Sequence, residues 1–446
     1  MIKLYEKDSY LTENETRVTS CTEVEGEYYI TLRESVFFPE EGGQNADTGS
    51  IYIMPGLLET ADDQYNAIRL LDGKLYKALD KNIKEILDNK GIAEAIGEDE
   101  REIVVYKVGA AIEAGSAVKC ELDYAFRYDR MQNHSGEHIL TGVIHNNYGF
   151  DNVGFHLSDD NYVTLDINGL LTYDQVMAME KEANRIIYAN MPITDTYPDG
   201  EELQELNYRS KIEIDGQVRL ITIADEKETV DICACCAPHV KRTGEVGIIK
   251  VISVINWKGG VRISMLAGRR ALEFINSEHE IIKGLTGILT TSSDNIQELV
   301  KAHIDEIGML KGKLATALEE NIIAQINSEL PVGVQDIGVI GEEIISDKGP
   351  VVEGNYIKFV SPDFPANSMK NIYNYMLSLY KGYVAVMSGD DENGYRYFGG
   401  SALKDSRELA AALRERFDAK GGGKADMVQG QIKASSKEIE AVIVEL

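Results

Sequence analysis

Two short clusters of candidate metal ligands lie far apart in this chain. The first is His134-Ser-Gly-Glu-His138 and the second is Cys235-Cys-Ala-Pro-His239. On a helix, His134 and His138 are one turn apart on the same face, so both imidazoles can reach one ion. Zinc prefers such mixed nitrogen and sulfur donors, arranged as a tetrahedron. We therefore predict a zinc site with His134, His138, Cys235 and His239 as ligands.

Several features of this site stay open at the level of the sequence. Cys233 and Cys236 flank the predicted Cys ligand, so either thiol could replace Cys235 or close the shell of a structural zinc site. Four protein ligands leave no free coordination position, whereas a catalytic zinc ion keeps one for water or substrate. Glu137 lies between the two His residues and could act as a general base, although exposed Glu residues are also common on helices.

Composition and charge limit the class of protein. The chain has 446 residues, enough for roughly two to four domains. Three of its five Cys residues are crowded at positions 233, 235 and 236, which fits metal binding in a reducing compartment better than disulfides. With no apolar leader and no membrane-spanning run, we expect a cytoplasmic protein without a membrane partner. The net charge of -29 means that any RNA-binding surface has to be local.

The patterns of apolar residues divide the chain into four parts. Residues 1–125 alternate like strands and predict a small antiparallel β-barrel. Residues 126–266 combine the His-bearing helix with strands, as in an α+β domain. Residues 267–330 predict a helical hairpin arm. Residues 331–446 alternate strands and helices again and predict a separate C-terminal α/β domain.

Two of these parts have an additional feature. Residues 62–89 predict a helix inserted into the barrel. The arm has a break over residues 290–294, where Ser and Asp residues can cap a new helix. After the break, the spacing of apolar residues is that of a short coiled coil, which leaves open a homodimer through this arm or through the C-terminal domain. These residues are Val300, Ile304, Ile307, Leu314 and Leu318.

Four stretches carry a resemblance to a known family. They match the glycine-rich signature of the family's N-terminal barrel, its two zinc motifs and the glycine motif of its DHH-associated domain. The stretches are Phe37-Phe-Pro-Glu-Glu-Gly-Gly-Gln44 with Asp47-Thr-Gly49, Arg127-Tyr-Asp-Arg-Met-Gln-Asn-His134 with His138, Cys235 with His239, and Gly421-Gly-Gly-Lys-Ala-Asp-Met427. The chain thereby resembles the long form of the trans-acting alanyl-tRNA editing proteins, which are similar to the editing and C-terminal domains of alanyl-tRNA synthetase.

This resemblance implies an α+β multidomain hydrolase: a β-barrel, a zinc-binding editing domain, a helical arm and a DHH-associated domain. The implied reaction is deacylation of alanine tRNA mischarged with Ser or Gly, in which zinc would activate water or instead position the substrate. A polar site distinguishes a hydroxyl group far better than an apolar cavity, and Ser35 and Gln44 are the candidates for contacting it. Ser35 stands where the family commonly has Thr, and His156 resembles a pocket-lining residue.

The candidate contacts with RNA are basic residues near the metal motifs and the glycine motif near the C-terminus. They are Arg242, Arg269, Arg270, Gly421, Gly422, Gly423 and Lys424. The second zinc motif departs from the family, which usually has Cys-Gly-Gly-Thr-His; here Pro238 removes a backbone N–H and Cys236 adds a thiol. The alternative function is therefore a non-catalytic, zinc-containing RNA-binding or scaffolding protein in which an extra thiol closes the metal shell.

Overall fold

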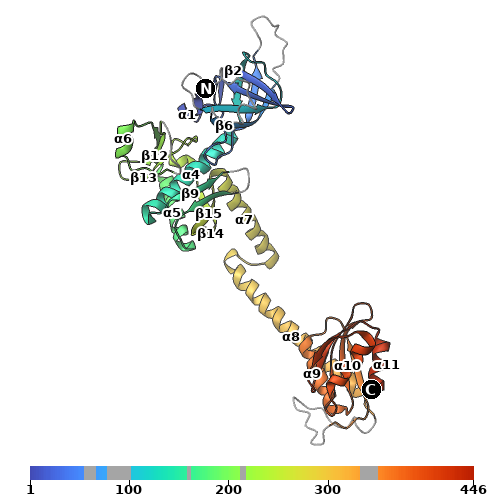
Figure 1. Ribbon diagram of the computed structural model, residues 1–446. Coiled ribbons are helices and arrows are strands. Elements are labelled where there is room, and N and C mark those ends of the chain that lie inside the picture. Colours follow the sequence, from blue (N-terminus) through green and yellow to red (C-terminus); the bar gives the residue numbers. More distant parts are fainter. Residues whose placement is uncertain (55–66, 78–101, 158–161, 211–216, 332–349) are drawn as a thin grey trace. The chain divides into compact units, whose positions relative to one another are not determined.

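A computed structural model gives the mixed α/β, multidomain architecture of the chain (Figure 1). The described residues form two compact units, residues 1–282 and 283–446. No helix among them is long and apolar enough to cross a membrane. The structure describes the whole chain except residues 55–66, 78–101, 158–161, 211–216 and 332–349.

The N-terminal part of the first unit is a closed antiparallel barrel (Figure 1). Side chains alternate along its strands, so that Val118, Cys120 and Leu122 are buried in the barrel core while Glu121 is exposed. The barrel expected from the sequence is thus confirmed. Around the barrel the strands are β2 (Glu13–Val24), β3 (Glu27–Leu32), β7 (Glu102–Val108), β6 (Ala67–Lys77), β5 (Gly49–Ile53) and β8 (Ala117–Leu122).

The helix expected over residues 62–89 is wrong where the structure describes this segment. Residues 67–77 form β6, which pairs with β5 on one side and β7 on the other. Residues 67–70 pair with β5 and residues 70–77 pair with β7, and this tertiary context outweighs the local helical pattern. The rest of the expected helix lies outside the described residues. Outside the barrel, β1 (Ile2–Lys3) pairs in parallel with β4 (Glu34–Ser35), and α1 (Leu4–Lys7) follows β1.

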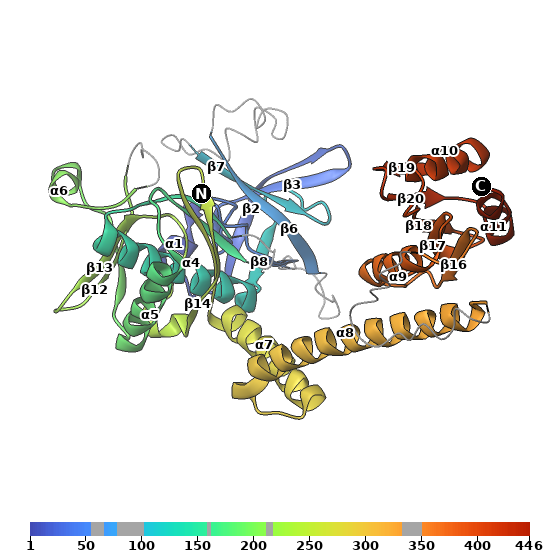
Figure 2. The ribbon, with the colours of Figure 1, turned by 90° about the horizontal axis from the view of Figure 1, so that it is seen from below.

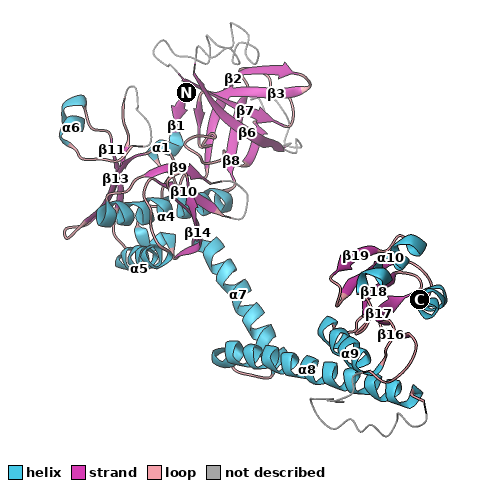
Figure 3. Cartoon of the chain, turned by 60° about the horizontal axis from the view of Figure 1, so that its bottom comes forward, coloured by secondary structure: helices cyan, strands magenta, loops and turns pink. Residues whose placement is uncertain are grey.

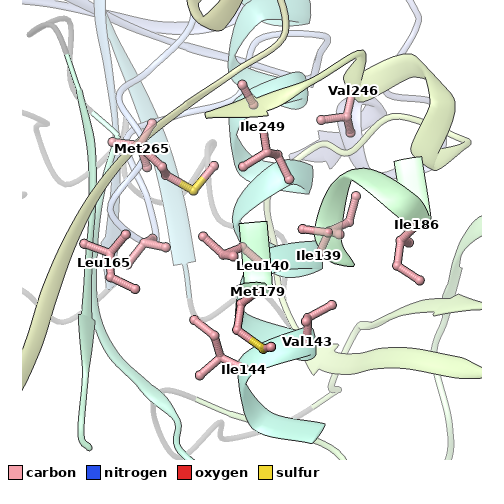
Figure 4. Close-up of a cluster of buried hydrophobic side chains, with 14 of the residues drawn as sticks. Ile139, Leu140, Val143, Ile144, Leu165, Met179, Ile186, Val246, Ile249 and Met265 are labelled. Atoms are coloured by element: carbon pink, nitrogen blue, oxygen red, sulfur yellow. The ribbon is translucent and has the colours of Figure 1, made fainter. Parts of the chain in front are cut away.

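A four-stranded sheet and two helices form the second core of the first unit (Figure 4). The central helix α4 (Tyr124–Tyr148) starts where Asp123 accepts a hydrogen bond from the N–H of Phe126, and it ends at the left-handed Gly149. The sheet order is β14 (Ile249–Trp257), β15 (Gly260–Ala267), β10 (Val163–Ile167), β9 (Asn152–His156), and the second helix is α5 (Tyr173–Ala189).

A three-stranded sheet lies against α4 and completes the first unit. Gly142 permits this contact, because a Cβ atom there would lie 2.5 Å from the carbonyl oxygen of Val230. The close approach brings the start of β13 next to the helix that carries His138. The remaining elements are β11 (Ile193–Thr196), α6 (Gly200–Glu205), β12 (Leu220–Ala224), β13 (Thr229–Ala234) and the short 3-10 helix η1 (Thr243–Val246).

The second unit contains a five-stranded sheet with helices on both faces (Figures 2 and 3). Val384 and Val386 pack with α9, whereas the alternating Ala385 and Met387 pack with α10 and α11. The sheet order is β16 (Tyr356–Val360), β17 (Val384–Asp390), β18 (Gly394–Gly400), β20 (Val428–Ile432), β19 (Lys420–Gly423), and the helices are α9 (Ala366–Leu379), α10 (Ser406–Phe417) and α11 (Ser436–Glu445).

Two long helices connect these sheets along the chain. They are α7 (Gly268–Leu289) and α8 (Ile296–Glu329), with the short η2 (Ser293–Asn295) at the expected break. The boundary between the two units falls within α7. The packing of the helices as a hairpin therefore stays a prediction.

Candidate metal centre

The helix α4 and the segment after β13 bring four candidate ligands together. The donor atoms of His134, His138, Cys235 and His239 all lie within 4.8 Å of one another. The Sγ atom of Cys235 is 3.6 Å from Nε2 of His134 and 3.3 Å from Nε2 of His239. In a tetrahedron with bonds of about 2.0 Å to nitrogen and 2.3 Å to sulfur, such an edge measures about 3.5 Å. The spacing thus suits a zinc ion.

Each of the three imidazoles is held through its other ring nitrogen. A ring whose Nδ1 carries the proton leaves a lone pair on Nε2, which is the atom that a metal needs. All three rings turn Nε2 toward the same place because Nδ1 is occupied. The Nδ1 atoms lie 2.8 Å from Oε1 of Gln44 for His134, 2.9 Å from Oδ2 of Asp231 for His138, and 2.9 Å from Oγ of Ser135 for His239.

The carboxylate of Asp231 is itself held by a guanidinium group. Arg209 donates from Nε to Oδ1 at 2.8 Å and from a terminal nitrogen to Oδ2 at 3.0 Å. Burial opposes ionisation of Asp231, but the hydrogen bond from His138 and the charge of Arg209 outweigh it, and the pKa of Asp231 is lowered. His138, Asp231 and Cys233 also lie close enough to hold an ion. The cation Arg209 already occupies that carboxylate, which argues against a metal there.

The three neighbouring thiols have different environments. Burial opposes ionisation of Cys235, but His134 and His239 outweigh it and hold the pKa of this thiol well below its usual value. Burial raises the pKa of Cys233 and, together with the nearby Cys235, that of Cys236. A metal binds the thiolate form. Electrostatics and geometry therefore both favour Cys235 over its two neighbours.

The imidazoles of His138 and His239 have opposite pKa shifts. Burial lowers the pKa of His239 to about 3. Burial also disfavours the charged form of His138, but the nearby carboxylates of Glu137 and Asp231 outweigh it and raise its pKa to about 9. Only neutral imidazoles bind metals. An ion at this site would therefore compete with a proton at His138.

A tight turn of the barrel segment delivers Gln44 to the centre. Glu41 and Gln44 exchange backbone hydrogen bonds of 3.1 and 3.0 Å, and the two residues between them, Gly42 and Gly43, have φ values of 61° and 83°. Two consecutive positive φ angles require glycine in a turn of this type. A Cβ atom at Gly43 would lie 2.3 Å from the carbonyl oxygen of Phe155. The turn is thus fixed against β9, and Gln44 reaches His134 from there.

Comparison with known proteins identifies relatives of this chain. Residues 218–285 match the second additional domain of threonyl and alanyl tRNA synthetases. The alanyl-tRNA editing protein AlaX-L of Pyrococcus horikoshii is 26% identical over 455 residues, which cover 99% of this chain and 97% of the relative. The chain resembles the alanyl-tRNA editing proteins over nearly its whole length. An alanyl-tRNA editing protein of Danio rerio is 23% identical over 459 residues, covering 99% of this chain and 96% of the relative.

The similarity to an alanine–tRNA ligase covers a smaller share of the relative's length than the similarity to the editing proteins does. The alanine–tRNA ligase of Pyrococcus abyssi is 26% identical over 455 residues, which are 98% of this chain but 43% of the ligase. The family resemblance expected from the sequence is confirmed, and with the alanyl-tRNA editing proteins it extends across both units.

Two of the three predicted catalytic residues lie beside the four donors. Gln44 contacts His134 through Oε1, while its buried Nε2 has no hydrogen-bond partner among the described residues. Glu137 is buried rather than exposed, and its Oε2 lies 3.7 Å from Nε2 of His138. Its other oxygen accepts hydrogen bonds from Asn152 at 2.5 Å and Thr141 at 3.2 Å. These two bonds hold the carboxylate of Glu137 next to the candidate metal position.

Ser35, the third predicted catalytic residue, has a different environment. It is fully buried, and its Oγ accepts a hydrogen bond of 3.1 Å from the N–H of Phe37. The phenol of Tyr106 lies 2.8 Å from the same oxygen. In the described part of the chain no hydrogen bond joins Ser35 to the four donors. Its contact with a substrate hydroxyl stays a prediction.

His156, which resembles a pocket-lining residue of the family, lies on the face of β9 turned away from the four donors. Phe155 faces the metal centre, with its ring 4.6 Å from that of His134. His156 is exposed and lies on the opposite face of β9, because successive side chains of a strand alternate. It is instead near Asp166 of β10.

The arginines predicted to contact RNA form contacts within the first unit. Arg242 donates a hydrogen bond of 2.5 Å to the carbonyl of Asn190. Arg270 lies 2.7 Å from Asp129, and Arg269 contacts the same carboxylate at 3.3 Å. The side chain of Arg269 is nevertheless 61% exposed, whereas that of Arg270 is 16% exposed. Of this pair, Arg269 is therefore the better placed to reach a phosphate.

The glycine motif lies in the second unit. Gly421, Gly422 and Gly423 form the edge strand β19, and Lys424 follows it on the surface. Gly421 and Gly422 also line a cavity of about 400 Å³ together with Arg396. Contact of this motif with RNA stays a prediction.

The residues that orient the imidazoles were missed by the sequence reasoning. Asp231 is the clearest case, and a signal for it existed: Asp231, Cys233 and Cys235 follow one another at a spacing of two, so that a continuous strand would place them on one face. Ser135 sits inside the first motif but has no feature that distinguishes it from any other helical Ser. Arg209 and Asn152 reach the site from segments without a recognisable motif.

Proposed function

We propose that this protein is a hydrolase that removes wrongly attached amino acids from alanine tRNA in trans. The observation that carries the proposal is the convergence of three imidazoles, each anchored at Nδ1, with one thiol of lowered pKa. The similarity to proteins named as alanyl-tRNA editing proteins supports this choice among metal hydrolases. The substrate class that we propose is Ser- or Gly-charged alanine tRNA.

We propose zinc as the ion, with His134, His138, Cys235 and His239 as its ligands. Three nitrogen donors and one sulfur donor suit zinc better than harder cations such as magnesium, which prefer oxygen. Bound at this site, zinc would supply a Lewis acid that polarises the ester or a water molecule, provided that the ion accepts it as a fifth ligand beside the four protein donors. Residues 126–266 would then be the zinc-binding editing domain, and residues 331–446 the DHH-associated domain.

Two side chains of the protein would act on the substrate directly. Glu137 is held by Asn152 and Thr141 beside the metal position, where its carboxylate can take the proton of an attacking water molecule. Gln44 is held at Oε1 by His134, so its Nε2 group is turned elsewhere and is available to donate to a substrate oxygen. An unpaired buried donor of this kind gains most from a substrate that carries the matching hydroxyl group.

The remaining proposals concern partners and location. RNA contacts would come from Arg242, Arg269 and Arg270 in the first unit, and from Lys424 and the glycine motif in the second. The homodimer through the arm or the C-terminal domain and the cytoplasmic location stay predictions. Apolar side chains of α8 such as Ile304 are exposed in the single chain.

One observation favours the alternative, a non-catalytic zinc protein that binds RNA. The four protein donors by themselves complete a tetrahedral shell, as in structural zinc sites. Such a protein would hold one equivalent of zinc and bind tRNA without releasing an amino acid.

The test is release of serine from Ser-charged alanine tRNA, with Ala-charged tRNA as the control substrate. We expect rapid release from the first and little from the second. Cys235→Ser should lose both zinc and activity, whereas the matched variants Cys233→Ser and Cys236→Ser should keep both. Stoichiometric zinc without selective release in the native protein would refute the hydrolase and favour the alternative.

A further inference from the structure

Three tyrosines gather where the barrel meets the start of α4. The ring centroids of Tyr124 and Tyr128 are 5.7 Å apart, and the ring of Tyr10 lies 6.4 Å from the first and 6.5 Å from the second. All three side chains are half-buried, so none is fully enclosed in either hydrophobic core. We call Tyr10, Tyr124 and Tyr128 the tyrosine patch.

Residues next to this patch form hydrogen bonds with His239 of the metal centre. Ser9, next to Tyr10 in the chain, donates a hydrogen bond of 2.8 Å to the carbonyl oxygen of His239. On α4, Ser135 contacts the ring of His239 and follows Tyr128 by seven residues. Seven residues are two helical turns, so both side chains lie on one face, about 10 Å apart along the axis. The tyrosine patch therefore lies close to the candidate metal site.

Basic side chains border the patch. The ammonium group of Lys241 lies 4.5 Å from the centre of the Tyr10 ring and 3.2 Å from a carboxylate oxygen of Asp8, and its side chain is 63% exposed. Arg242 is exposed next to it, and Arg269 is exposed although it contacts Glu273. Lys241 and Arg269 are paired with the exposed carboxylates of Asp8 and Glu273. Because exposed ion pairs are weak, the phosphates of an RNA strand can replace these carboxylates as partners of the two cations.

The carboxylate of Glu245 is held by two tyrosines of the patch and by the backbone of Arg242. Oε2 of Glu245 accepts a hydrogen bond of 2.5 Å from Tyr10 and one of 3.4 Å from Tyr128. Oε1 accepts a bond of 3.1 Å from the backbone N–H of Arg242. Burial, with help from Glu245, raises the pKa of Tyr128 to about 12, so its ring stays neutral at physiological pH.

We propose that the tyrosine patch binds the unpaired nucleotides that precede the terminal nucleoside of the tRNA. The proposal rests on the proposed function, which puts the esterified terminal nucleoside at the metal centre. The preceding nucleotides must then lie on the nearby surface. Aromatic rings stack on bases of any kind, and Lys and Arg side chains pair with the phosphates between them. Aromatic and basic groups together suit single-stranded RNA, whereas a protein partner would not need this charge.

The test compares two substrates that share the ester. One is Ser-charged alanine tRNA, and the other is the seryl ester of adenosine, which lacks every other nucleotide. Tyr128→Leu should raise KM for the tRNA about tenfold with little change in kcat, since a stacked base contributes roughly that much binding. Hydrolysis of the adenosine ester should not change. Lys241→Ala, at an exposed position that is safe for folding, should also raise KM for the tRNA alone.

Controls separate the patch from other effects. Tyr128→Phe keeps the ring and should behave like the native protein, as should Tyr188→Leu, which alters a tyrosine of α5 that is 77% exposed. An unchanged KM in both Tyr128→Leu and Lys241→Ala would overturn the proposal. Equal losses on both substrates would also overturn it, because they would point to a distorted metal centre.

A binding measurement keeps the proposal testable if the protein proves not to be a hydrolase. Uncharged tRNA should bind the native protein more tightly than the same tRNA trimmed of its unpaired 3′ nucleotides. Tyr128→Leu should abolish this difference. Equal affinity for the two RNAs would refute the patch, whereas a difference in affinity without any serine release would refute only the proposed reaction.

Discussion

At the metal centre each imidazole is fixed at two points, by its approach to Cys235 and by a partner on Nδ1. The partner of His138 is the most consequential, because Asp231 carries a charge and is in turn held by Arg209. A carboxylate on the far side of the ring raises the basicity of the ligand and fixes its orientation. The affinity for metal should therefore depend on residues that never touch the ion.

The first prediction concerns Asp231. Asp231→Asn keeps the shape of the side chain but removes its charge, so zinc affinity should fall about 10- to 100-fold. A competition titration with a chromophoric chelator measures this. Asp225→Asn is the matched control, because Asp225 is an exposed residue of the turn before the same strand. Equal affinity in both variants would show that Asp231 does not orient His138.

The second prediction concerns the pH dependence of the metal-free protein. The pKa of His239 falls from 6.5 to about 3 on folding, so its contribution to stability is present above pH 6.5 and lost as the pH falls toward about 3. The pKa of His138 rises from 6.5 to about 9, so its contribution is present below pH 6.5 and lost as the pH rises toward about 9. Together these two residues favour a maximum of stability near pH 6.5.

Urea unfolding with a chelator present, repeated across this pH range, checks the prediction. His138→Gln should remove the decline on the alkaline side and leave the acidic side unchanged. Zinc keeps both rings neutral, so the metal-loaded protein should not show the alkaline decline. A decline of equal size in the His138→Gln variant would contradict the assignment.

The sequence predicted which residues approach one another better than how they are held. A spacing of four on a helix is enough to bring His134 and His138 together, and that spacing is local. The partners of their Nδ1 atoms come from the barrel turn and from β13, so they depend on tertiary contacts that no local pattern encodes. Glu137 is an intermediate case: its position was predicted, but its burial by Asn152 was not.

At the scale of elements, α4 does more than carry ligands. Near its start, Arg127 is fully buried and forms an ion pair with Asp47, close to the glycine turn. The same guanidinium group donates 2.7 Å to the carbonyl of Val36 and 3.2 Å to that of Ser9. Asp47 in turn accepts from the N–H of Phe38 at 2.6 Å. This network links two elements of the site. One is the barrel segment that carries Gln44, and the other is the helix α4, which carries His134.

The third prediction tests this network. Asp47→Asn leaves the charge of Arg127 buried without a counter-ion, so the free energy of unfolding should fall by about 3 to 5 kcal/mol. The matched control is Glu13→Gln, which breaks the exposed pair with Lys119 and should cost less than about 1 kcal/mol. Urea unfolding of both variants measures these changes in the free energy of unfolding. Equal and small losses would mean that the buried pair does not fasten the two elements.

Helices and strands whose apolar residues recur at a regular spacing were predicted from the sequence. Strands that form only because neighbouring strands pair with them were not. The break between α7 and α8 was expected because Ser and Asp residues favour the start of a helix. The strand β6 was mistaken for part of a helix, since only its neighbours β5 and β7 make an extended conformation favourable. The barrel itself was recovered because several of its strands alternate clearly.

At the scale of the whole molecule, the two units have separate hydrophobic cores. The cores of the first unit lie inside the barrel and between α4, α5 and the four-stranded sheet. Those of the second unit cover both faces of the five-stranded sheet and include Ile326 at the end of α8. Each unit therefore has the apolar interior that independent folding requires.

The fourth prediction follows from this division. A fragment of residues 1–290, which keeps α7 whole, should fold, bind zinc as tightly as the full chain and hydrolyse the seryl ester of adenosine. Its KM for Ser-charged tRNA should be higher than that of the full chain if the second unit contacts RNA. Zinc titration and kinetics on the two substrates measure these effects. A fragment that is unfolded or unable to bind zinc would show that the first unit depends on the second.

The partners of the three Nδ1 atoms come from three places: the barrel turn, α4 itself and β13. None of the four candidate donors comes from the barrel, yet through Gln44 the barrel decides which nitrogen of His134 is free to bind. Binding of the ion therefore requires that the barrel, α4 and β13 of the first unit are all in their folded positions. Partial unfolding of the barrel alone should release metal before any ligand-bearing segment comes apart, which makes a chelator a sensitive probe of that distant event.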